Sequence, residues 1–347
     1  MKRLALYFTA PGQVSVREEG LPTPGNGQLL VQSLLSAISP GTELLIYRGE
    51  FPPGLPLDEN IPSLQGGFSY PLQYGYATVG RVIAAGPGAD PAWEGRLVFA
   101  FQPHASYFNS EPGGLIPVPA ELSPEQAVFL PNMETAVNFI MDGQPLLGEH
   151  VTVFGQGIVG LLTTALLARH PLASLVTLDK YPRRRLASLD SGATACFDPQ
   201  ATDLLPRLET IQPQGADLTY ELSGSPAALD QAIRVTGYAG RVVLGSWYGS
   251  KRASLDLGGR FHRSRIRLLS SQVSSLAPEF SGRWSKERRF SVAWKMLQEL
   301  KPSRWITHRF PLEEAEQAYR LLDTQPGEAL QVLFTYTGVA TGEAEVG

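Results

Sequence analysis

The fold of this chain is decided by the stretch Val151-Thr-Val-Phe-Gly155-Gln156-Gly157-Ile158-Val159-Gly160. A β-branched apolar run precedes its glycines and another apolar run follows them, which predicts a strand, a tight turn and a helix. In such a turn the first glycine permits the bend, the second lets the backbone approach a pyrophosphate, and the third lets helix and strand pack closely. The helix N-terminus also directs amide groups at the phosphates. The whole stretch from Gly155 to Gly160 is therefore predicted to bind a dinucleotide.

The residues that end the next predicted strand indicate which dinucleotide is expected. Asp179 stands where a carboxylate accepts hydrogen bonds from the adenosine ribose and repels a 2′-phosphate. Lys180 and Arg184 favour the opposite choice, because cationic side chains there can hold a 2′-phosphate, although they are equally typical of a solvated first helical turn. NAD is the expected cofactor, and NADP is the alternative.

Composition limits the class of protein. The 347 residues, 43% hydrophobic and 18% charged, are enough for two globular domains. A formal net charge of −4 gives no reason to expect nucleic acid or a membrane surface as a partner. One cysteine, Cys196, excludes an intramolecular disulfide, and no apolar run approaches the roughly 18 residues that span a bilayer. We therefore expect a cytoplasmic protein that acts on a small molecule.

The first part of the chain, up to about residue 131, predicts an antiparallel β-domain. Short alternating runs such as Leu29–Ser33, Gly80–Ala85 and Gly95–Ala100 are separated by glycine and proline. The N-terminus alternates like an edge strand and lacks the apolar length of a signal peptide. The segment Gly49–Tyr74 is rich in Pro and Gly without periodicity, which predicts a long surface loop.

Residues 132–274 alternate between strand-like and helix-like runs, which predicts a parallel sheet covered on both faces. A long helix, Pro124–Met141, is expected to precede this sheet. The expected helices include Ile158–Arg169 and Ala227–Val235. The expected strands are Val151–Phe154, Leu175–Asp179, Asp217–Leu222, Arg241–Ser246 and Ile266–Ser270.

Residues 275–347 begin with a basic loop around Arg283 and Trp284. Two helices are expected after it, Ser291–Leu300 and the amphipathic Pro311–Leu322. The strand Leu330–Tyr336 then precedes a polar tail that we expect to be frayed. Because a lone strand must pair with something, the N-terminal β-domain is its expected host.

The order of these blocks resembles the medium-chain dehydrogenase/reductase superfamily. The resemblance is carried by Gly41-Thr42-Glu43 with Tyr47-Arg-Gly, by Gly80–Gly88, by Gly95–Ala100, by the glycine-rich stretch and by Ile306–Ala318. It implies an α/β protein with a GroES-like antiparallel β-domain (1–131), a Rossmann doubly wound parallel sheet (132–274) and a C-terminal segment that returns to the first domain (275–347). It also implies cofactor contacts from Thr135, Ser223, Gly224, Gly245 and Ser246, and a homodimer that pairs through the strand Ile266–Ser270.

The chain departs from the zinc enzymes that it resembles. Those enzymes have a cysteine before a Gly-Thr-Asp, then a Gly-His-Glu and a later cysteine or glutamate ligand. Here Pro40 precedes Gly41, the second motif reads Gly75-Tyr76-Ala77, and the third region offers only Glu134. A catalytic zinc needs about three protein ligands, and the four-cysteine structural lobe is missing as well. No metal is therefore expected.

Hydride transfer without zinc needs another group that stabilises the developing oxyanion. Tyr76, which stands where the zinc enzymes have a histidine, is the first candidate, because a phenol with a reference pKa of about 10 stays protonated and can donate. Alternatively, its ring only fills the vacated space. Thr42 matches the hydroxyl residue that relays protons in the zinc enzymes, or it stabilises the turn after Pro40-Gly41. Ser39 and His104 are weaker candidates.

The resemblance leaves three functions open. The first is a zinc-independent NAD(P)(H) oxidoreductase that interconverts an alcohol and a carbonyl, similar to the polyol, threonine and bacteriochlorophyllide dehydrogenase branches. The second is a quinone or enoyl reductase, as many zinc-free members of the superfamily are. The third is a non-catalytic dinucleotide-binding sensor or partner subunit.

Overall fold

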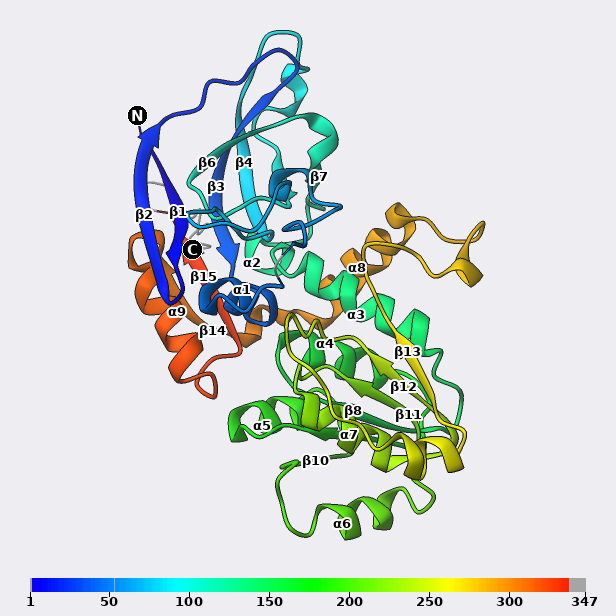
Figure 1. Ribbon diagram of the computed structural model, residues 1–347. Helices are drawn as coiled ribbons and strands as arrows, with labels where there is room; N and C mark the ends of the chain where they lie inside the picture. Colours follow the sequence, from blue (N-terminus) through cyan, green and yellow to red (C-terminus); the bar gives the residue numbers. More distant parts are fainter. Residues whose placement is uncertain (1, 53, 337–347) are drawn as a thin grey trace, which may run out of the picture. The chain divides into compact units, whose positions relative to one another are not determined.

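The computed structural model describes residues 2–52 and 54–336 (Figure 1). The chain forms two compact units. The first contains the residues up to Leu130 together with those from Lys301 onwards, and the second contains Pro131–Leu300. The chain thus leaves its first unit beside the expected boundary at residue 131, and it returns at residue 301 rather than 275.

The first unit is built mainly on antiparallel strands, as its short alternating runs predict. A seven-stranded sheet has the order β14-β15-β3-β4-β5-β7, with β6 paired to β3, and β1 and β2 form a separate hairpin. The strands are β1 (Lys2–Ala10), β2 (Gln13–Gly20), β3 (Leu29–Ala37), β4 (Thr78–Ala85), β5 (Leu97–Ala100), β6 (Tyr107–Ser110), β7 (Leu115–Pro117), β14 (Ile306–Pro311) and β15 (Gln331–Thr335).

The C-terminal strand β15 returns to the first unit, as expected. It pairs antiparallel with β3 and parallel with β14. This pairing satisfies the backbone amides and carbonyls that a lone strand would leave exposed. The antiparallel pairing of β15 with β3 and the antiparallel hairpin of β1 and β2 confirm the expected antiparallel β-domain. The polar tail predicted after Tyr336 lies outside the described residues.

Residues 41–43 are not the turn that the sequence indicated. They belong to the first turn of helix α1 (Pro40–Arg48), in which proline takes the first position and Gly49 closes the helix with a φ of +72°. The turn interpretation is wrong because a proline followed by glycine is typical of turns but also of a helix start, and the apolar residues that follow here pack into the core. Leu44 and Ile46 are buried there.

The irregular segment from Gly49 to Tyr74 is a long surface loop, as predicted, and a few buried side chains anchor it. It contains the short 3₁₀ turn η1 (Pro62–Leu64). Phe51, Leu64 and Leu72 are buried in the cluster that also contains side chains of α1 and of helix α9 (Ala315–Thr324). The segment therefore supplies packing of its own, as compact long loops do.

The second unit contains a six-stranded parallel sheet in the order β10-β9-β8-β11-β12-β13. The chain order of these strands reverses between β8 and β11, and in such sheets ligands bind at the carboxyl ends of the strands at that point. The strands are β8 (His150–Phe154), β9 (Ser174–Leu178), β10 (Ala195–Phe197), β11 (Ala216–Glu221), β12 (Thr236–Leu244) and β13 (Arg267–Ser270). Five of them were predicted, and β10 was missed because it is only three residues long.

Helices cover both faces of this sheet, which confirms the doubly wound prediction. Phe139 of α3 (Leu130–Gly143) and Leu167 of α4 (Ile158–Leu167) pack on one face. Side chains of α6 (Leu204–Ile211) and α7 (Pro226–Val235) pack on the other. Helix α5 (Pro182–Asp190) lies against β9 and β10.

The single helix expected over Pro124–Met141 is wrong, since the chain forms α2 (Pro124–Ala127) and then α3. The cause is Pro131, which lacks an amide hydrogen and whose ring clashes with the carbonyl four residues earlier, that of Ala127. Further along, α8 (Lys286–Leu300) starts earlier than expected and α9 starts later. Among the described residues, none of the helices combines the length and apolarity needed to cross a bilayer.

Candidate functional site

The turn after β8 has the geometry that its glycines predict. Gly155 takes a φ of +88°, and a Cβ there would lie 2.7 Å from backbone atoms that follow β11. A Cβ at Gly160 would lie 2.0 Å from the carbonyl oxygen of Gly155. A Cβ at Gly157, the N-cap of α4, would instead meet Arg184 Nη1 at 3.8 Å and nothing else within 4 Å. Gly155 and Gly160 thus serve the packing of the turn, and Gly157 keeps its outer side open.

The remaining residues of the turn present backbone rather than side chains. The amide side chain of Gln156 is fully buried, donates to the Gly155 carbonyl over 3.0 Å and accepts from Thr164 Oγ1 over 2.9 Å. Ile158 and Val159 form the first turn of α4, and the Ile158 side chain is buried. An anion at this turn would be held by amide groups and by the positive end of the helix dipole.

Asp179 follows β9 at the same edge of the sheet and orders the turn. Its Oδ2 accepts from the Gln156 amide over 2.8 Å, and its Oδ1 accepts from the Tyr181 amide over 2.8 Å. The Arg184 guanidinium lies 4.0 Å from the carboxylate and 4.9 Å from the Tyr181 ring centroid, and Lys180 Nζ lies 4.8 Å from the same centroid. The acid and its two basic neighbours therefore lie around the Tyr181 ring at this edge of the sheet.

The carboxyl ends of β11 and β12 are joined by a buried acid that the sequence analysis missed. Glu221 accepts from the Ser223 amide over 2.8 Å, from the Ser223 hydroxyl and from Tyr248 Oη over 2.8 Å. Ser246 Oγ accepts from the Gly224 amide over 2.9 Å. The predicted residues at these strand ends thus lie together, and Glu221 orients them. Its signal in the sequence was an acid at the end of a predicted strand, at the same edge of the sheet as Asp179.

Two further predicted cofactor residues lie where α3 packs on the sheet. A Cβ at Gly245 would lie 2.4 Å from the ring of Phe139, so the glycine admits the helix. Thr135 Oγ1 donates to the Pro131 carbonyl one turn earlier, over 2.8 Å. Its hydroxyl is satisfied within α3, which leaves its two lone pairs to accept from a ligand.

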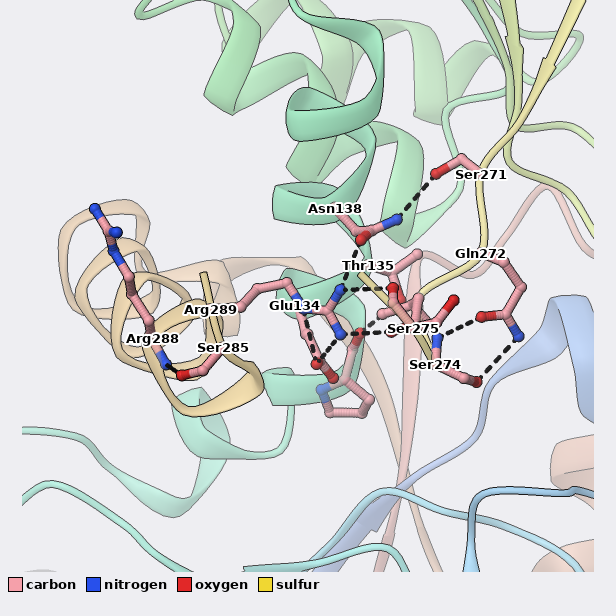
Figure 2. Close-up of polar contacts among 12 residues, drawn as sticks. Glu134, Thr135, Asn138, Ser271, Gln272, Ser274, Ser275, Ser285, Arg288 and Arg289 are labelled. Atoms are coloured by element: carbon pink, nitrogen blue, oxygen red, sulfur yellow. Dashed lines mark hydrogen bonds and ion pairs between the residues drawn. The ribbon is translucent and has the colours of Figure 1, made fainter. Parts of the chain in front are cut away.

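A buried ion pair between Glu134 and Arg289 lies beside Thr135 (Figure 2). Arg289 Nη2 and Nε donate to Glu134 Oε1 over 2.7 and 3.1 Å, and Nη1 donates to Asn138 Oδ1 over 2.6 Å. The guanidinium also donates to the carbonyls of Val273 and Ser275. With Arg289 only 1% exposed, α8 is held to α3 inside the second unit.

Glu134, the one possible metal ligand in the third motif, is thus engaged by a cation of the protein itself. Burial raises the pKa of its carboxyl group, and the Arg289 charge opposes that rise. The neighbouring Asn138 Nδ2 donates to Ser271 Oγ over 3.0 Å and to Asp142 Oδ2 over 2.9 Å. This network links the segment after β13 to α3 (Figure 2).

In the first unit the structure brings three hydroxyl groups together at the start of α1. Tyr76 Oη donates to Ser39 Oγ in a short hydrogen bond and lies 3.4 Å from Thr42 Oγ1. The Tyr76 side chain is partly exposed and packs against the apolar core, with the Tyr74 ring 6.3 Å away in an edge-on arrangement. Burial raises the pKa of the Tyr76 phenol, although its bonds to Ser39 and Thr42 oppose the rise. The group is therefore a protonated donor at neutral pH.

His104 is placed beneath this cluster rather than in it. The ring is fully buried, with Nε2 at 3.0 Å from Glu43 Oε2 and Nδ1 at 2.7 Å from Ser36 Oγ. The hydroxyl cluster does not suit zinc, because thiolate and imidazole are the ligands that zinc prefers there. Among the described residues no group of three or more His, Cys, Asp or Glu side chains is placed to hold a metal.

The sequence was compared with known families and proteins. The family model described as "Zinc-binding dehydrogenase" matches residues 159–290. An uncharacterized zinc-type alcohol dehydrogenase-like protein, YphC, of Escherichia coli K12 is 27% identical and aligns over 92% of this chain and 95% of its own length. An L-threonine 3-dehydrogenase of Pyrococcus horikoshii is 24% identical over 96% of this chain and 98% of its own length.

Solved structures agree in fold. The E. coli CFT073 protein rspB, described as a short chain alcohol dehydrogenase in complex with NADH, has a TM-score of 0.76 at 20% identity, over 96% of this chain and 99% of that one. A Sinorhizobium meliloti 1021 protein described as a "putative zinc-binding dehydrogenase" bound to NADP has a TM-score of 0.75 at 21% identity, with the same coverage. At these identities the similarity shows the fold alone.

Proposed function

We propose that the chain, whose relatives are medium-chain dehydrogenases, is an oxidoreductase of that superfamily. In this proposal it interconverts an alcohol and a carbonyl compound with a nicotinamide dinucleotide and without zinc. The observation that carries the proposal is the Tyr76 phenol, hydrogen-bonded to Ser39 and near Thr42. A protonated donor is what the oxygen of a carbonyl requires when hydride reaches its carbon. Relatives named as dehydrogenases support the enzymatic function over a sensor without turnover.

The residues at the carboxyl edge of the parallel sheet fit a nicotinamide dinucleotide. The turn from Gly155 to Gly160 would hold the pyrophosphate through backbone amides, and Ser223, Gly224, Gly245 and Ser246 would contact the nicotinamide half. When bound, the nicotinamide supplies or accepts the hydride. The protein groups bind and orient it.

We propose NAD as the preferred form. Asp179 uses its two oxygens for two backbone amides, but a carboxylate offers about four acceptor sites and can still accept from ribose hydroxyls. Its negative charge disfavours a 2′-phosphate, and the cations of Lys180 and Arg184 reduce that effect. Fluorescence titration should give a lower Kd for NADH than for NADPH. An equal or reversed preference would show that the two cations dominate.

Zinc independence is supported by the side chains at the positions where the zinc enzymes have their ligands. Three hydroxyl groups replace the usual ligands, and Glu134 is engaged by Arg289. In reduction the Tyr76 phenol would donate its proton to the carbonyl oxygen, and Ser39 or Thr42 would relay a proton from solvent water back to the phenolate while keeping its own hydroxyl protonated. The raised pKa of the phenol favours this direction at neutral pH, because donation needs the protonated form.

The test is a panel of aldehydes, ketones, quinones and activated alkenes, assayed by NADH consumption with a metal analysis of the same preparation. We expect turnover of carbonyls, no stoichiometric zinc, and a fall in kcat/KM of about 10²–10⁴ in Tyr76→Phe, the range for a lost general acid. The matched control is Tyr107→Phe on β6, which removes a hydroxyl that accepts a hydrogen bond from Gln32 of β3. Activity on quinones or alkenes alone, or an equimolar zinc signal, would replace this proposal with the reductase or the metal enzyme.

A further inference from the structure

A buried carboxylate with several partners lies beneath the hydroxyl cluster of the first unit. Glu43 is fully buried. Its Oε1 accepts from the backbone amide of Ser39 over 2.7 Å, and its Oε2 accepts from Tyr319 Oη over 2.5 Å and lies 3.0 Å from His104 Nε2. Because a carboxylate only accepts, the Nε2 atom of His104 is the donor in that contact.

The hydrogen bonds continue beyond the histidine. His104 Nδ1 lies 2.7 Å from Ser36 Oγ, which lies 2.7 Å from Tyr336 Oη. Ser36, His104 and Glu43 are each fully buried. A nucleophilic role for Ser36 is excluded, because no substrate reaches a serine that is buried and already bonded on both sides. The hydrogen-bonded cluster of Ser36, His104 and Glu43 is therefore not itself a site of covalent chemistry.

Both members of the Tyr76–Ser39 hydrogen bond are held by the Glu43–His104 pair. On one side, Ser39 is the N-cap of α1, and its amide is bound by Glu43. On the other side, Gly75 directly precedes Tyr76 and takes a φ of +123°, and a Cβ on it would lie 2.8 Å from the His104 ring. The imidazole thus lies against the backbone that carries the phenol.

Stability alone does not account for such a pair. Replacing buried ionic groups with apolar ones of similar size is often neutral or stabilising, so a buried carboxylate is weak evidence of a stabilising role. The cluster instead joins β3, α1, α9 and the loop before β6 at the point where the hydroxyl groups meet. Catalytic groups need this kind of support to stay within a fraction of an ångström of their working geometry.

We propose that Glu43 and His104 are positioning residues that set the geometry of the Tyr76–Ser39 hydrogen bond for proton donation. The inference rests on the proposed function. It is supported by charge, because Glu43 acts with burial to keep Tyr76 protonated, and the charge of Asp58 acts in the same sense. Tyr74, the other titratable group facing Tyr76, has a pKa that burial raises strongly, so it is neutral as well.

The experiment uses the full chain and the variants Glu43→Gln and Tyr319→Phe, with Glu125→Gln as control, since Glu125 forms an exposed ion pair with Arg309. Glu43→Gln is expected to lower kcat for the best carbonyl about 10- to 100-fold, within the range for general acid catalysis. The Kd for NADH should stay unchanged, because the proposed cofactor residues are in the second unit. Tyr319→Phe, which removes one donor to Glu43, should give a smaller loss. Glu125→Gln should change neither quantity.

A second readout separates positioning from mere support of the fold. The Tyr76 phenol is titrated by ultraviolet difference spectra against Tyr76→Phe, which needs no turnover. In Glu43→Gln its titration, and the alkaline limb of the kcat profile, should move to lower pH because a negative charge has been removed. If wild-type protein shows no carbonyl turnover, the proposed function fails, and the spectral titration still tests the positioning.

The proposal is overturned if Glu43→Gln keeps the wild-type kcat and the wild-type phenol titration. It is also overturned if kcat falls only in parallel with the folded fraction, measured by circular dichroism. If Glu43→Gln does not fold, Tyr319→Phe decides: unchanged kcat and titration in that variant would reject the proposal.

Discussion

Gly157 and Gly160 stand three residues apart in one turn, yet a methyl group would act on them differently. At Gly160 it would lie 2.0 Å from a backbone oxygen, whereas at Gly157 the nearest atom is the end of a flexible arginine at 3.8 Å. Gly160 is therefore required by the fold. Gly157 is required only if a ligand approaches its outer side.

We therefore predict that Gly157→Ala keeps the melting temperature of the ligand-free protein but weakens NADH binding at least tenfold. Gly160→Ala should lower the melting temperature itself, because helix and strand can no longer pack closely. Calorimetry and fluorescence titration of both variants check this. Unchanged NADH affinity in Gly157→Ala would remove the turn from the cofactor site.

Asp142 gives a prediction for stability against pH. Burial raises the pKa of its carboxyl group, and its Oδ1 is buried with no hydrogen-bond partner in the described part of the chain. A pKa raised in the folded state contributes stability below the unfolded pKa, and that contribution is lost as the pH rises through the folded pKa. The melting temperature of Asp142→Asn relative to wild type should therefore be higher at about pH 7 than at about pH 4. A difference that is the same at both pH values would contradict this.

At the scale of elements, the join between α3 and α8 depends on the Glu134–Arg289 pair. Arg289→Met should lower the free energy of unfolding by about 3–5 kcal/mol, because it leaves a buried carboxylate unpaired. The double variant Glu134→Leu with Arg289→Met should recover much of that loss. Urea denaturation followed by tryptophan fluorescence measures both.

The control for this cycle is Arg309→Met in the first unit. Arg309 pairs with Glu125, and both side chains are well exposed. Exposed pairs contribute about 0–1 kcal/mol, so its effect should be small. A loss in Arg289→Met no larger than in this control would mean that the pair does not hold the two helices together.

Elements with a strong local pattern could be predicted from the sequence. The strand and helix around the glycine-rich turn, the strand before Asp179 and the returning strand β15 each follow from apolar periodicity and a clear end signal. The single helix over Pro124–Met141 is wrong at Pro131, and the turn interpretation of residues 41–43 is wrong as well, because proline and glycine mark helix starts as well as turns. Periodicity does not separate those cases.

At the scale of the whole molecule, we propose a homodimer through β13. This strand is the edge of the six-stranded sheet, and Leu268 on it is 37% exposed. An unpaired edge offers backbone groups to a second copy of the same strand. Light scattering should give twice the chain mass, and Leu268→Glu should shift the protein toward monomer by placing like charges at the pairing edge. A monomeric wild-type protein would refute the proposal.

By itself, the sequence determined the dinucleotide turn, the acid at the end of β9 and the return of the last strand, because each depends on residues close together in the chain. Only the tertiary structure decided that Glu134 faces Arg289, 155 positions away, and that Glu43 faces His104 and Tyr319. Long-range side-chain contacts leave no periodic signal in the sequence. A buried acid needs a partner, but the residues next to it in the chain do not identify that partner. The glycine-rich turn thus predicts a dinucleotide site from local sequence, whereas the partners of Tyr76 are decided by the tertiary structure.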